Sequence, residues 1–407
     1  MKVAMVSEHA SPLAAIGGVD AGGQNVHVAA LARALAARGH EVTVYTRRDD
    51  ARLPGLVETD EGYAVRHLRA GPPVVLPKDD LLPHMPELAT ELAGDWSVRR
   101  PDVAHAHFWM SGTASVAAGA ATGVPVVQTF HALGTVKRRH QGVLDTSPPQ
   151  RIGIERRVAA DVARVVATCS DEVRELARMG VPRHRVSVVP CGVDVQHFTP
   201  VPAPGEAERP GHRPRVLVVG RLVERKGVAD AISALARVPG AELLVAGGPT
   251  ADRLDADPEV QRLRRVARKH EVDDRVRLLG QVDRQAMPAL MRSADAVVAV
   301  PWYEPFGIVP LEAMACGRPV VASAVGGLTD TVVDGVTGVL VPPRDPRSLA
   351  TALRDLLASP ARRRRLGAAG LERARRHYTW QQVAARTEAV YEEVRRAAVD
   401  RMLEAPA

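Results

Sequence analysis

Residues 301–317 read Pro-Trp-Tyr-Glu-Pro-Phe-Gly-Ile-Val-Pro-Leu-Glu-Ala-Met-Ala-Cys-Gly. The apolar run that leads into this stretch, residues 296–301, predicts a buried strand. Residues 311–316 predict the first turns of a helix. The loop between them contains a carboxylate, a glycine and free backbone N–H groups. Open α/β sheets bind their ligands at such places, where a strand ends and a helix starts, so this loop is the first candidate for a binding site.

Two carboxylates in this stretch, Glu304 and Glu312, indicate what kind of ligand the loop binds. A carboxylate accepts hydrogen bonds from neighbouring hydroxyl groups. The N–H groups at a helix start favour an anion. The combination predicts a polyhydroxylated, anionic ligand, and a nucleotide sugar fits both requirements.

Composition sets the class of protein. The chain has 407 residues, of which 46% are hydrophobic and 25% charged, which is typical of a soluble globular protein with two domains. Its three cysteines, Cys169, Cys191 and Cys316, are scattered and odd in number. They fit neither a disulfide framework nor a cysteine metal site, so we expect a reducing cytoplasm. The apolar run at residues 1–6 is too short for a signal peptide and predicts a strand. No run reaches a membrane-spanning length.

The net charge of +7 and the pI near 9.7 raise the question of a phosphate-bearing partner. Arginines cluster at residues 362–365 and 373–376, where a helical pattern favours a solvated face. Aromatic residues do not alternate with these cations, so nucleic-acid binding is not favoured. Peripheral contact with a membrane stays open, and so does the oligomeric state, a homodimer included.

Strand-like and helix-like segments alternate along the chain, which is the pattern of doubly wound parallel sheets. In the first half, strands are expected at residues 3–6, 41–45, 103–106, 124–128, 164–167 and 186–189, with helices such as 26–38 and 171–179. In the second half, strands are expected at 215–219, 242–246, 275–279, 296–300, 319–322 and 339–341, with helices at 230–236, 258–269, 287–292 and 347–358.

The pattern divides the chain into domains. The alternation stops in Pro/Gly-rich sequence at residues 199–214, which predicts a linker between domains at 1–198 and 215–380. Long charged helices at 381–407 are expected to pack back toward the first domain. Two α/β domains of similar size in tandem predict a cleft between them.

Two cations follow the strand that ends at Gly220. Arg221 and Lys226 lie in the turn before the next helix. An arginine can bind a diphosphate through two N–H groups and a lysine as a point charge. Beside the Glu304–Glu312 loop, these residues favour diphosphate binding over a basic turn with no ligand.

A glycine pair, Gly22 and Gly23, lies between the first strand and the first helix. Glycines there allow backbone N–H groups to approach an anion at a helix start. The spacing is not the GxGxxG of dinucleotide-binding proteins, which argues against a dehydrogenase. A tight turn without a ligand explains the pair equally well.

Three histidines follow or lie on strands of the first domain. His105 and His107 alternate on one strand and therefore share a face. His131 follows the next strand, and its expected place at the strand end makes it the better functional candidate. A zinc site is not favoured because no acidic or thiolate ligand is spaced with them, so we expect no metal. Lys78 and Arg151 lie in irregular sequence and, taken alone, predict surface charges.

With these residues together, the chain resembles the retaining glycosyltransferases of family four, which have two facing Rossmann-like domains (the GT-B architecture). The resemblance extends from residue 1 to about residue 395. Closer similarity, to the branch of sucrose-phosphate synthases and the mycothiol-pathway inositol-phosphate N-acetylglucosaminyltransferases, comes from Asp-Ala-Gly-Gly-Gln-Asn at 20–25, His-Ala-His-Phe-Trp-Met-Ser-Gly at 105–112 and Val-Gly-Gly at 325–327.

The resemblance implies a role for each residue. The first domain is the acceptor side and the second binds the nucleotide sugar. Glu312 is implied to bind the ribose, and His131 to lie beside the donor sugar near the reacting centre. The sugar hydroxyls and the diphosphate are implied to contact Glu304, the backbone of Phe306, Gly307 and Ile308, the cations Arg221 and Lys226, and Gly23. Neither a metal nor another cofactor is implied, because the cations and helix starts take its place.

The acceptor side is implied to comprise Gly22, Gly23, Lys78, Phe108 and Arg151. In members that use phosphorylated acceptors, a lysine and an arginine at the positions of Lys78 and Arg151 bind the phosphate. The inositol-phosphate enzyme has a tyrosine and a threonine where this chain has Phe108 and Ala132. Loss of these two hydroxyls disfavours inositol phosphate as the acceptor and leaves another phosphorylated or polar acceptor open.

The sequence therefore predicts a retaining, metal-independent transfer of a hexose from a nucleoside diphosphate sugar, with UDP favoured, to a small hydroxylated acceptor. One alternative is a nucleotide-sugar epimerase, which the arrangement around Glu304 disfavours. Another is a nucleotide-sugar-binding protein without catalysis, which the intact Glu304, His131, Arg221 and Lys226 disfavour.

Overall fold

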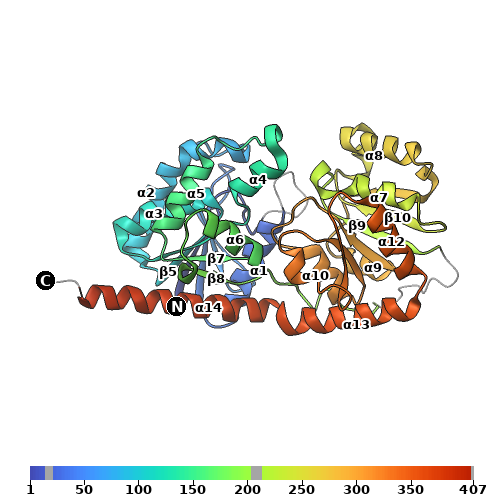
Figure 1. Ribbon diagram of the computed structural model, residues 1–407. Helices are drawn as coiled ribbons and strands as arrows, with labels where there is room; N and C mark the ends of the chain where they lie inside the picture. The colour runs from blue at the N-terminus through green and yellow to red at the C-terminus, as the bar shows by residue number, and fades with distance from the viewer. Residues whose placement is uncertain (14–21, 203–212, 405–407) are drawn as a thin grey trace. The chain divides into compact units, whose positions relative to one another are not determined.

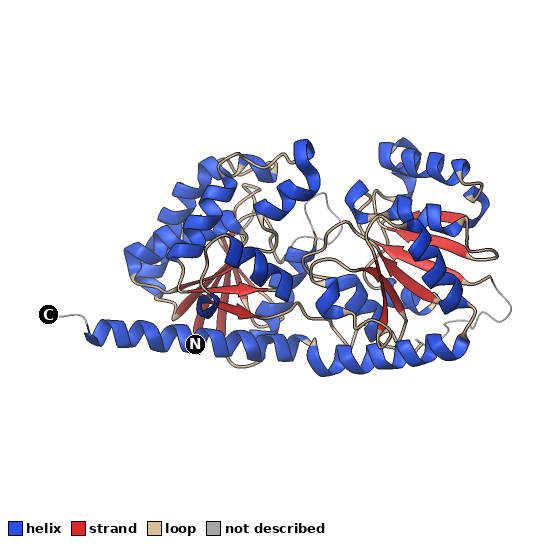
Figure 2. Ribbon diagram, in the orientation of Figure 1, coloured by secondary structure: helices blue, strands red, loops and turns tan. Residues whose placement is uncertain are grey.

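The computed structural model describes residues 1–13, 22–202 and 213–404 (Figure 1). The chain forms two compact units. The first comprises Met1–Pro190 and Trp380–Ala407, and the second comprises Cys191–Thr379. Most of the linker that we expected at 199–214 lies outside the described residues. Each unit is an α/β domain with helices around its sheet, as the sequence predicted (Figure 2).

The sheet of the first unit has, within the described residues, eight strands in the order β3-β4-β2-β1-β5-β6-β7-β8. The strands are β1 (Lys2–Val6), β2 (Glu41–Arg47), β3 (Leu56–Glu58), β4 (Ala64–Leu68), β5 (Val103–His107), β6 (Val126–Thr129), β7 (Arg164–Ala167) and β8 (Val186–Val188). All neighbours are parallel except β3, which pairs antiparallel with β4 at the edge. Parallel strands are covered on both faces, and this explains why β1 and β5 are almost continuously buried.

The sheet of the second unit is parallel throughout its described strands, in the order β11-β10-β9-β12-β13-β14. These strands are β9 (Arg215–Val219), β10 (Glu242–Ala246), β11 (Val276–Gly280), β12 (Ala296–Ala299), β13 (Val320–Ser323) and β14 (Gly338–Val341). Strand β9 lies between β10 and β12, so the chain changes direction across the sheet at this point. Ligands bind open α/β sheets at such a switch point, and the loops after β9 and β12 meet there.

Helices cover both sheets. The first unit contains α1 (Gly23–Ala36), α2 (Met85–Arg99), α3 (Trp109–Thr122), α4 (Gly134–Gln141), α5 (Arg151–Asp161), α6 (Ser170–Arg178) and α14 (Trp380–Glu404). The second contains α7 (Val228–Leu235), α8 (Pro258–Lys269), α9 (Met287–Arg292), α10 (Ile308–Ala315), α11 (Leu328–Thr331), α12 (Pro346–Leu357) and α13 (Pro360–His377). No helix in the described part of the chain combines the length and the apolar character needed to cross a membrane.

Helix α14 packs against α1 and β5 and completes the first unit (Figure 1). Its Tyr391 hydroxyl lies 2.7 Å from Nδ1 of His105 on β5. Its Glu388 carboxylate binds Arg38 and lies 3.1 Å from Nε2 of His40, and both partners lie between α1 and β2. Helix α14 therefore contributes buried contacts to the first unit.

The arginine clusters of α13 are not wholly solvated, which corrects part of the expectation for this helix. Arg373 donates hydrogen bonds to the carbonyls of Asp330 and Thr331, at 2.7 and 3.0 Å. Arg363 donates to the carbonyls of Leu356 and Leu357. These carbonyls end helices α11 and α12, where backbone acceptors lack partners within the helix.

Candidate functional site

The loop after β12 and the turn after β9 meet in the second unit. Glu304 accepts a hydrogen bond from the Lys226 ammonium group, and their side chains are 15% and 24% exposed. Burial opposes ionisation of Glu304, but the charge and hydrogen bond of Lys226, the nearby Arg225 and the backbone of Phe306 hold its pKa below the usual range. The sequence placed Glu304 and Lys226 in one site, and the structure brings them into contact.

Glycines shape the backbone of the loop that contains Glu304. Gly307 has φ +75° and immediately precedes α10, so the first N–H groups of the helix follow directly after the Glu304 loop. The N–H of Gly327 donates to the Glu304 carbonyl at 2.8 Å. A Cβ atom at Gly326 would lie 2.3 Å from the same oxygen. The two glycines of the Val-Gly-Gly sequence at 325–327 are therefore required by the backbone of the site loop.

The turn after β9 contains a further arginine, Arg225, beside the two cations predicted from the sequence. Arg221 is exposed. Burial lowers the pKa of Arg225, while the negative charge of Glu304 acts to raise it and the positive charge of Arg221 acts to lower it. The Arg225 carbonyl accepts a hydrogen bond from the N–H of Trp302, at 2.8 Å, which joins the two loops. Arg225 and Lys226 thus lie near Glu304, and Arg221 lies near Arg225.

Glu312 lies on α10 with a partner that the sequence analysis did not identify. The side chain is 6% exposed, and its Oε1 atom lies 3.2 Å from Nη1 of Arg284. Burial raises the pKa of Glu312 to about 7, although Arg284 acts to lower it. Arg284 follows β11 by a few residues, so its position after a strand end was the available signal.

The glycine pair of the first unit lies at the start of α1. Gly23 is the first residue of the helix, and the N–H of Gly22 donates to Oδ1 of Asn25 at 3.0 Å. Gln24 donates to the Ser7 hydroxyl and to the His107 carbonyl, at 3.1 and 3.3 Å, which connects α1 to the ends of β1 and β5. The rest of the expected turn, residues 20 and 21, lies outside the described residues.

Four histidines are buried together behind these strand ends. Nδ1 of His107 lies 2.9 Å from Nε2 of His131, and Nε2 of His105 lies 2.8 Å from the Thr129 hydroxyl. The His27 ring lies 5.1 Å from that of His131. Burial is the main cause that lowers the pKa of all four histidines. Neighbouring histidines lower the pKa further for His105, His107 and His131. The cluster is therefore neutral near pH 7. Among the described residues, no three His, Cys, Asp or Glu side chains are arranged to hold a metal ion.

His131 and Phe108 have backbone conformations that are unusual for residues other than glycine. Their φ angles are +62° and +83°, and each residue follows the end of a strand, β6 or β5. Backbone strain of this kind is found preferentially at functional sites. Gln128 supports the turn by donating to the carbonyls of Phe108 and Thr129, at 3.1 and 2.9 Å.

Lys78 and Arg151 converge on the Phe108 ring. Nζ of Lys78 lies 5.5 Å from the ring centroid, and Cζ of Arg151 lies 5.2 Å from it. The loops that contain the two cations are joined, because the Thr146 hydroxyl donates to Asp79 at 2.7 Å. Two residues that are seventy-three positions apart in the sequence thus reach one place in the first unit.

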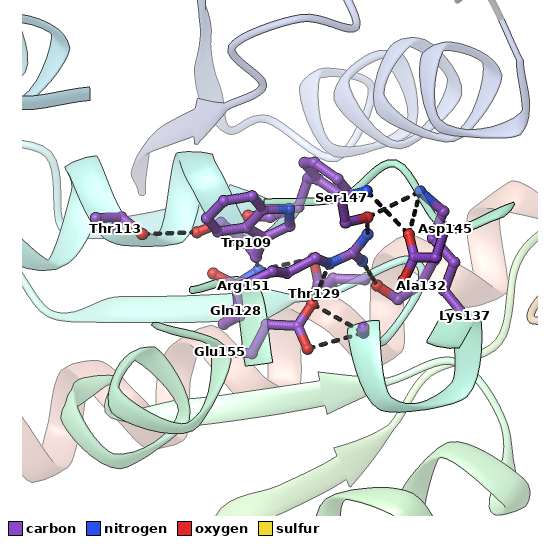
Figure 3. Close-up of polar contacts among 12 residues, drawn as sticks. Trp109, Thr113, Gln128, Thr129, Ala132, Lys137, Asp145, Ser147, Arg151 and Glu155 are labelled. Atoms are coloured by element: carbon purple, nitrogen blue, oxygen red, sulfur yellow. Dashed lines mark hydrogen bonds and ion pairs between the residues drawn. The ribbon is translucent and has the colours of Figure 1, made fainter. Parts of the chain in front are cut away.

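Arg151 is not a surface charge, which corrects the interpretation of that residue taken alone. Its side chain is 3% exposed and donates to Glu155 at 2.7 Å, to the Ser147 hydroxyl at 3.1 Å and to the carbonyl of Ala132 (Figure 3). Glu155 also accepts from the N–H of Gly134 at 2.8 Å. The ion pair therefore fixes the turn between His131 and α4.

A further buried carboxylate of the first unit, Glu8, was not among the residues predicted from the sequence. Glu8 follows β1 and is 1% exposed. It accepts a hydrogen bond from the Ser111 hydroxyl, and its Oε1 lies 2.7 Å from Nδ1 of His9. The His9 ring lies edge-on against Phe108, with centroids 4.9 Å apart. The available signal was the Ser-Glu-His sequence immediately after the first strand.

Comparisons with known proteins agree with this arrangement. Residues 21–197 match the family described as "Glycosyltransferase Family 4", and residues 204–373 match "Glycosyl transferases group 1". A D-inositol 3-phosphate glycosyltransferase of Xylanimonas cellulosilytica is 40% identical, over 96% of either chain. The enzyme of that name from Kineococcus radiotolerans is 39% identical over 99% of this chain and 97% of its own.

Solved structures show the same fold. The sucrose-phosphate synthase of Thermosynechococcus elongatus superposes with a TM-score of 0.89 at 33% identity, over 97% of this chain and 99% of its own. The HepE protein of Anabaena, solved with UDP and glucose, has a TM-score of 0.74 at 18% identity, over 96% of this chain and 99% of its own, and this shows the fold alone. The chain belongs to the group 1 and family 4 glycosyltransferases of the GT-B type and is a glycosyltransferase.

Proposed function

We propose that the enzyme transfers a hexose from a UDP sugar to a small phosphorylated polyol, with retention of configuration and without a metal ion. Relatives that cover nearly the whole chain are named D-inositol 3-phosphate glycosyltransferases, and a solved relative is a sucrose-phosphate synthase. Their names support a phosphorylated acceptor. Inositol 3-phosphate is the first acceptor to test.

The observation that carries the proposal is the convergence of Lys78 and Arg151 on the Phe108 ring, at 5.5 and 5.2 Å. Two cations that approach one ring from separate loops favour a dianionic group near them. Ser147 and Glu155 hold Arg151 in place, so its guanidinium is oriented before a ligand arrives. Phe108 and Ala132 offer no side-chain hydroxyl, and we therefore assign phosphate binding to the two cations.

On the donor side, the grouping of Arg221, Arg225 and Lys226 supports a diphosphate site. These cations would stabilise the charge that develops on the leaving diphosphate, as a metal ion does in other enzymes. Glu304, held ionised by Lys226, would accept hydrogen bonds from the sugar hydroxyls. The start of α10, which follows Gly307 and begins at Ile308, offers N–H groups to the same ligand.

Glu312 would bind the ribose, and His131, buried and neutral, would lie beside the donor sugar. In the retaining reaction that we propose, the acceptor hydroxyl attacks the face from which the diphosphate leaves. The bond from the anomeric carbon to the diphosphate breaks, the new glycosidic bond forms, and the acceptor proton passes to the leaving phosphate. This course requires no nucleophile from the protein.

The test compares phosphorylated and unphosphorylated inositol as acceptors, with a panel of nucleotide sugars as donors. Wild type should favour a UDP sugar and the phosphorylated acceptor. Lys78→Ala should lower kcat/KM for that acceptor on the order of 10- to 100-fold, as expected for loss of a charge-assisted contact. Lys269→Ala, which removes an exposed lysine of α8, is the matched control and should leave kcat/KM unchanged. Equal use of both acceptors by wild type would refute the phosphate site.

A further inference from the structure

Trp302 connects three loops at the carboxyl end of the second unit's sheet, and the proposed donor contacts do not include it. Its own loop follows β12 and leads to Glu304 two residues later. Its backbone N–H donates to the Arg225 carbonyl at 2.8 Å, in the turn after β9. Its indole ring lies against the guanidinium of Arg344, in the loop after β14. A single residue therefore contacts the loops that follow β9 and β14 from the loop that follows β12.

The turn after β9 fits closely against the strand end that precedes Trp302. Gly227 has φ +70°, and a Cβ atom there would lie 2.0 Å from the Val300 carbonyl oxygen. This close approach and the Trp302–Arg225 hydrogen bond attach the turn to the loop at two points. Lys226 stands between the two attached residues, so the position of its ammonium group depends on both attachments.

The contact between Arg344 and the Trp302 ring is close. Cζ of Arg344 lies 3.8 Å from the ring centroid, compared with 5.2 Å for Arg151 over Phe108. A cation over the face of an indole is attracted by the electrons of the ring. Arg344 has φ +57°, a conformation that costs free energy in a residue other than glycine. The stack offsets this cost, and the cap that Asp345 forms on α12 fixes the backbone next to it.

A carboxylate of α7 interacts with both members of the stack. Burial raises the pKa of Asp230, while a hydrogen bond from the Trp302 side chain and the positive charge of Arg344 act to lower it. The indole thus has a cation on its face and a hydrogen bond to a carboxylate. These two interactions hold the tryptophan in one orientation, and they come from elements other than its own loop.

We propose that Trp302 is a positioning residue of the donor site, which holds the cationic turn at 221–227 at a fixed separation from the Glu304 loop, and that Arg344 and Asp230 keep its indole in place. The inference rests on the proposed function for the ligand, a nucleoside diphosphate sugar. Trp302 acts on that ligand through the backbone of Arg225 and through its own loop. An exposed arginine after β14 thereby affects the affinity for the diphosphate.

The first experiment measures the Kd for UDP by calorimetric titration, which also gives the stoichiometry of binding. Trp302→Ala loses both side-chain interactions and should bind UDP about 10-fold more weakly at full stoichiometry. Trp302→Phe keeps a ring for Arg344 but has no indole N–H, and should lose about 3-fold. An unchanged Kd in Trp302→Ala would overturn the inference. A lower stoichiometry at the wild-type Kd would also overturn it, because a merely structural role predicts that result.

The second experiment changes Arg344, whose side chain is exposed. Arg344→Gly removes the stack and suits φ +57°, so UDP should bind about 3- to 10-fold more weakly while the thermal unfolding midpoint without ligand stays near that of wild type. Arg344→Lys keeps a cation over the ring and should retain more of the affinity. Arg347→Ala, at an exposed position of α12, is the control and should bind UDP as wild type does. Equal losses in the glycine and lysine variants would overturn the role of the stack.

A double-mutant cycle determines whether Arg344 acts through Trp302. In the Trp302→Ala background, Arg344→Gly should cause little further loss of UDP affinity, because the two side chains form one interaction. Independent losses that multiply would mean that Arg344 affects the ligand by another route, and would overturn the inference.

Failure of the proposed function appears in wild type and not in the variants. Wild type would then bind ADP or GDP more tightly than UDP, and the variants are compared with the nucleotide that it prefers. A wild-type protein that binds none of the three nucleoside diphosphates would overturn both proposals.

Discussion

Arg151 and Glu155 are four residues apart on α5 and form an ion pair with side chains that are 3% and 0% exposed. Burial raises the pKa of Glu155, while Arg151 and the N–H of Gly134 act to lower it. The absence of a Cβ atom at Gly134 makes room for the pair, since that atom would lie 3.1 Å from Nε of Arg151. Spacing along the helix is visible in the sequence, but burial of the pair under a turn from another element is not.

Glu155→Gln should destabilise the protein by about 3 kcal/mol, because it leaves a buried guanidinium without its carboxylate. Urea unfolding measures the change. Glu61→Gln, which breaks the exposed pair of Glu61 with Arg33, is the control and should cost less than about 1 kcal/mol. Equal effects of the two substitutions would show that the Arg151–Glu155 pair does not anchor the His131 turn.

Glu312 should make donor binding depend on pH. Burial raises its pKa to about 7, so the ionised carboxylate, which we propose accepts ribose hydrogen bonds, predominates only above that pH. Affinity for a UDP sugar should therefore rise with pH and be up to about tenfold weaker at pH 6 than at pH 8. Calorimetric titration at each pH measures this affinity, with a nucleotide sugar whose diphosphate does not titrate in this range. Glu312→Gln should bind more weakly and show a flat profile; a wild-type profile that is flat would contradict the assignment.

At the scale of elements, strands were easier to predict than helices. The second unit's strands are short apolar runs, and β9, β10 and β12 lie within a residue of their predicted ranges. Helix α3 was missed because Gly112 and Gly119 weaken a helical pattern. Both glycines are needed for packing: a Cβ atom would lie 2.1 Å from Gln128 Oε1 at Gly112 and 2.7 Å from the Val124 carbonyl at Gly119.

In the candidate site, residues whose role follows from the local sequence were predicted, and residues whose role depends on partners distant in the sequence were not. The loops with Glu304 and Lys226 were predicted because each follows a recognisable strand and precedes a helix. Arg284 was not, since its importance comes from its partner on another element, Glu312 on α10. Sequence patterns report periodicity and turns, whereas these contacts depend on which strand ends the topology brings together.

Helix α14 should stabilise the histidine cluster through a single hydrogen bond. Tyr391→Phe removes the hydroxyl that lies 2.7 Å from Nδ1 of His105 and leaves that buried nitrogen without its partner. The expected cost is about 1–2 kcal/mol in the free energy of unfolding. Glu392→Gln, at an exposed position next to it, is the control and should have no effect. No loss of stability in Tyr391→Phe would mean that His105 does not depend on α14.

At the scale of the whole molecule, each unit brings its own group of charged residues to the carboxyl ends of its strands. The first has Lys78, Arg151 and Glu155, and the second has Lys226 and Glu304. A chain with a net charge of +7 is suited to substrates that both carry phosphate. The division of labour that we propose, a phosphorylated acceptor on one unit and a nucleotide sugar on the other, follows from these two groups.

The most direct test is the proton NMR spectrum of the product formed from a UDP sugar and inositol 3-phosphate in the presence of EDTA. The account predicts one new glycosidic linkage, with the anomeric configuration of the donor, formed at a rate that chelation does not change. A product of inverted configuration, or free sugar in place of a glycoside, would contradict it. So would loss of product on chelation that manganese or magnesium restores.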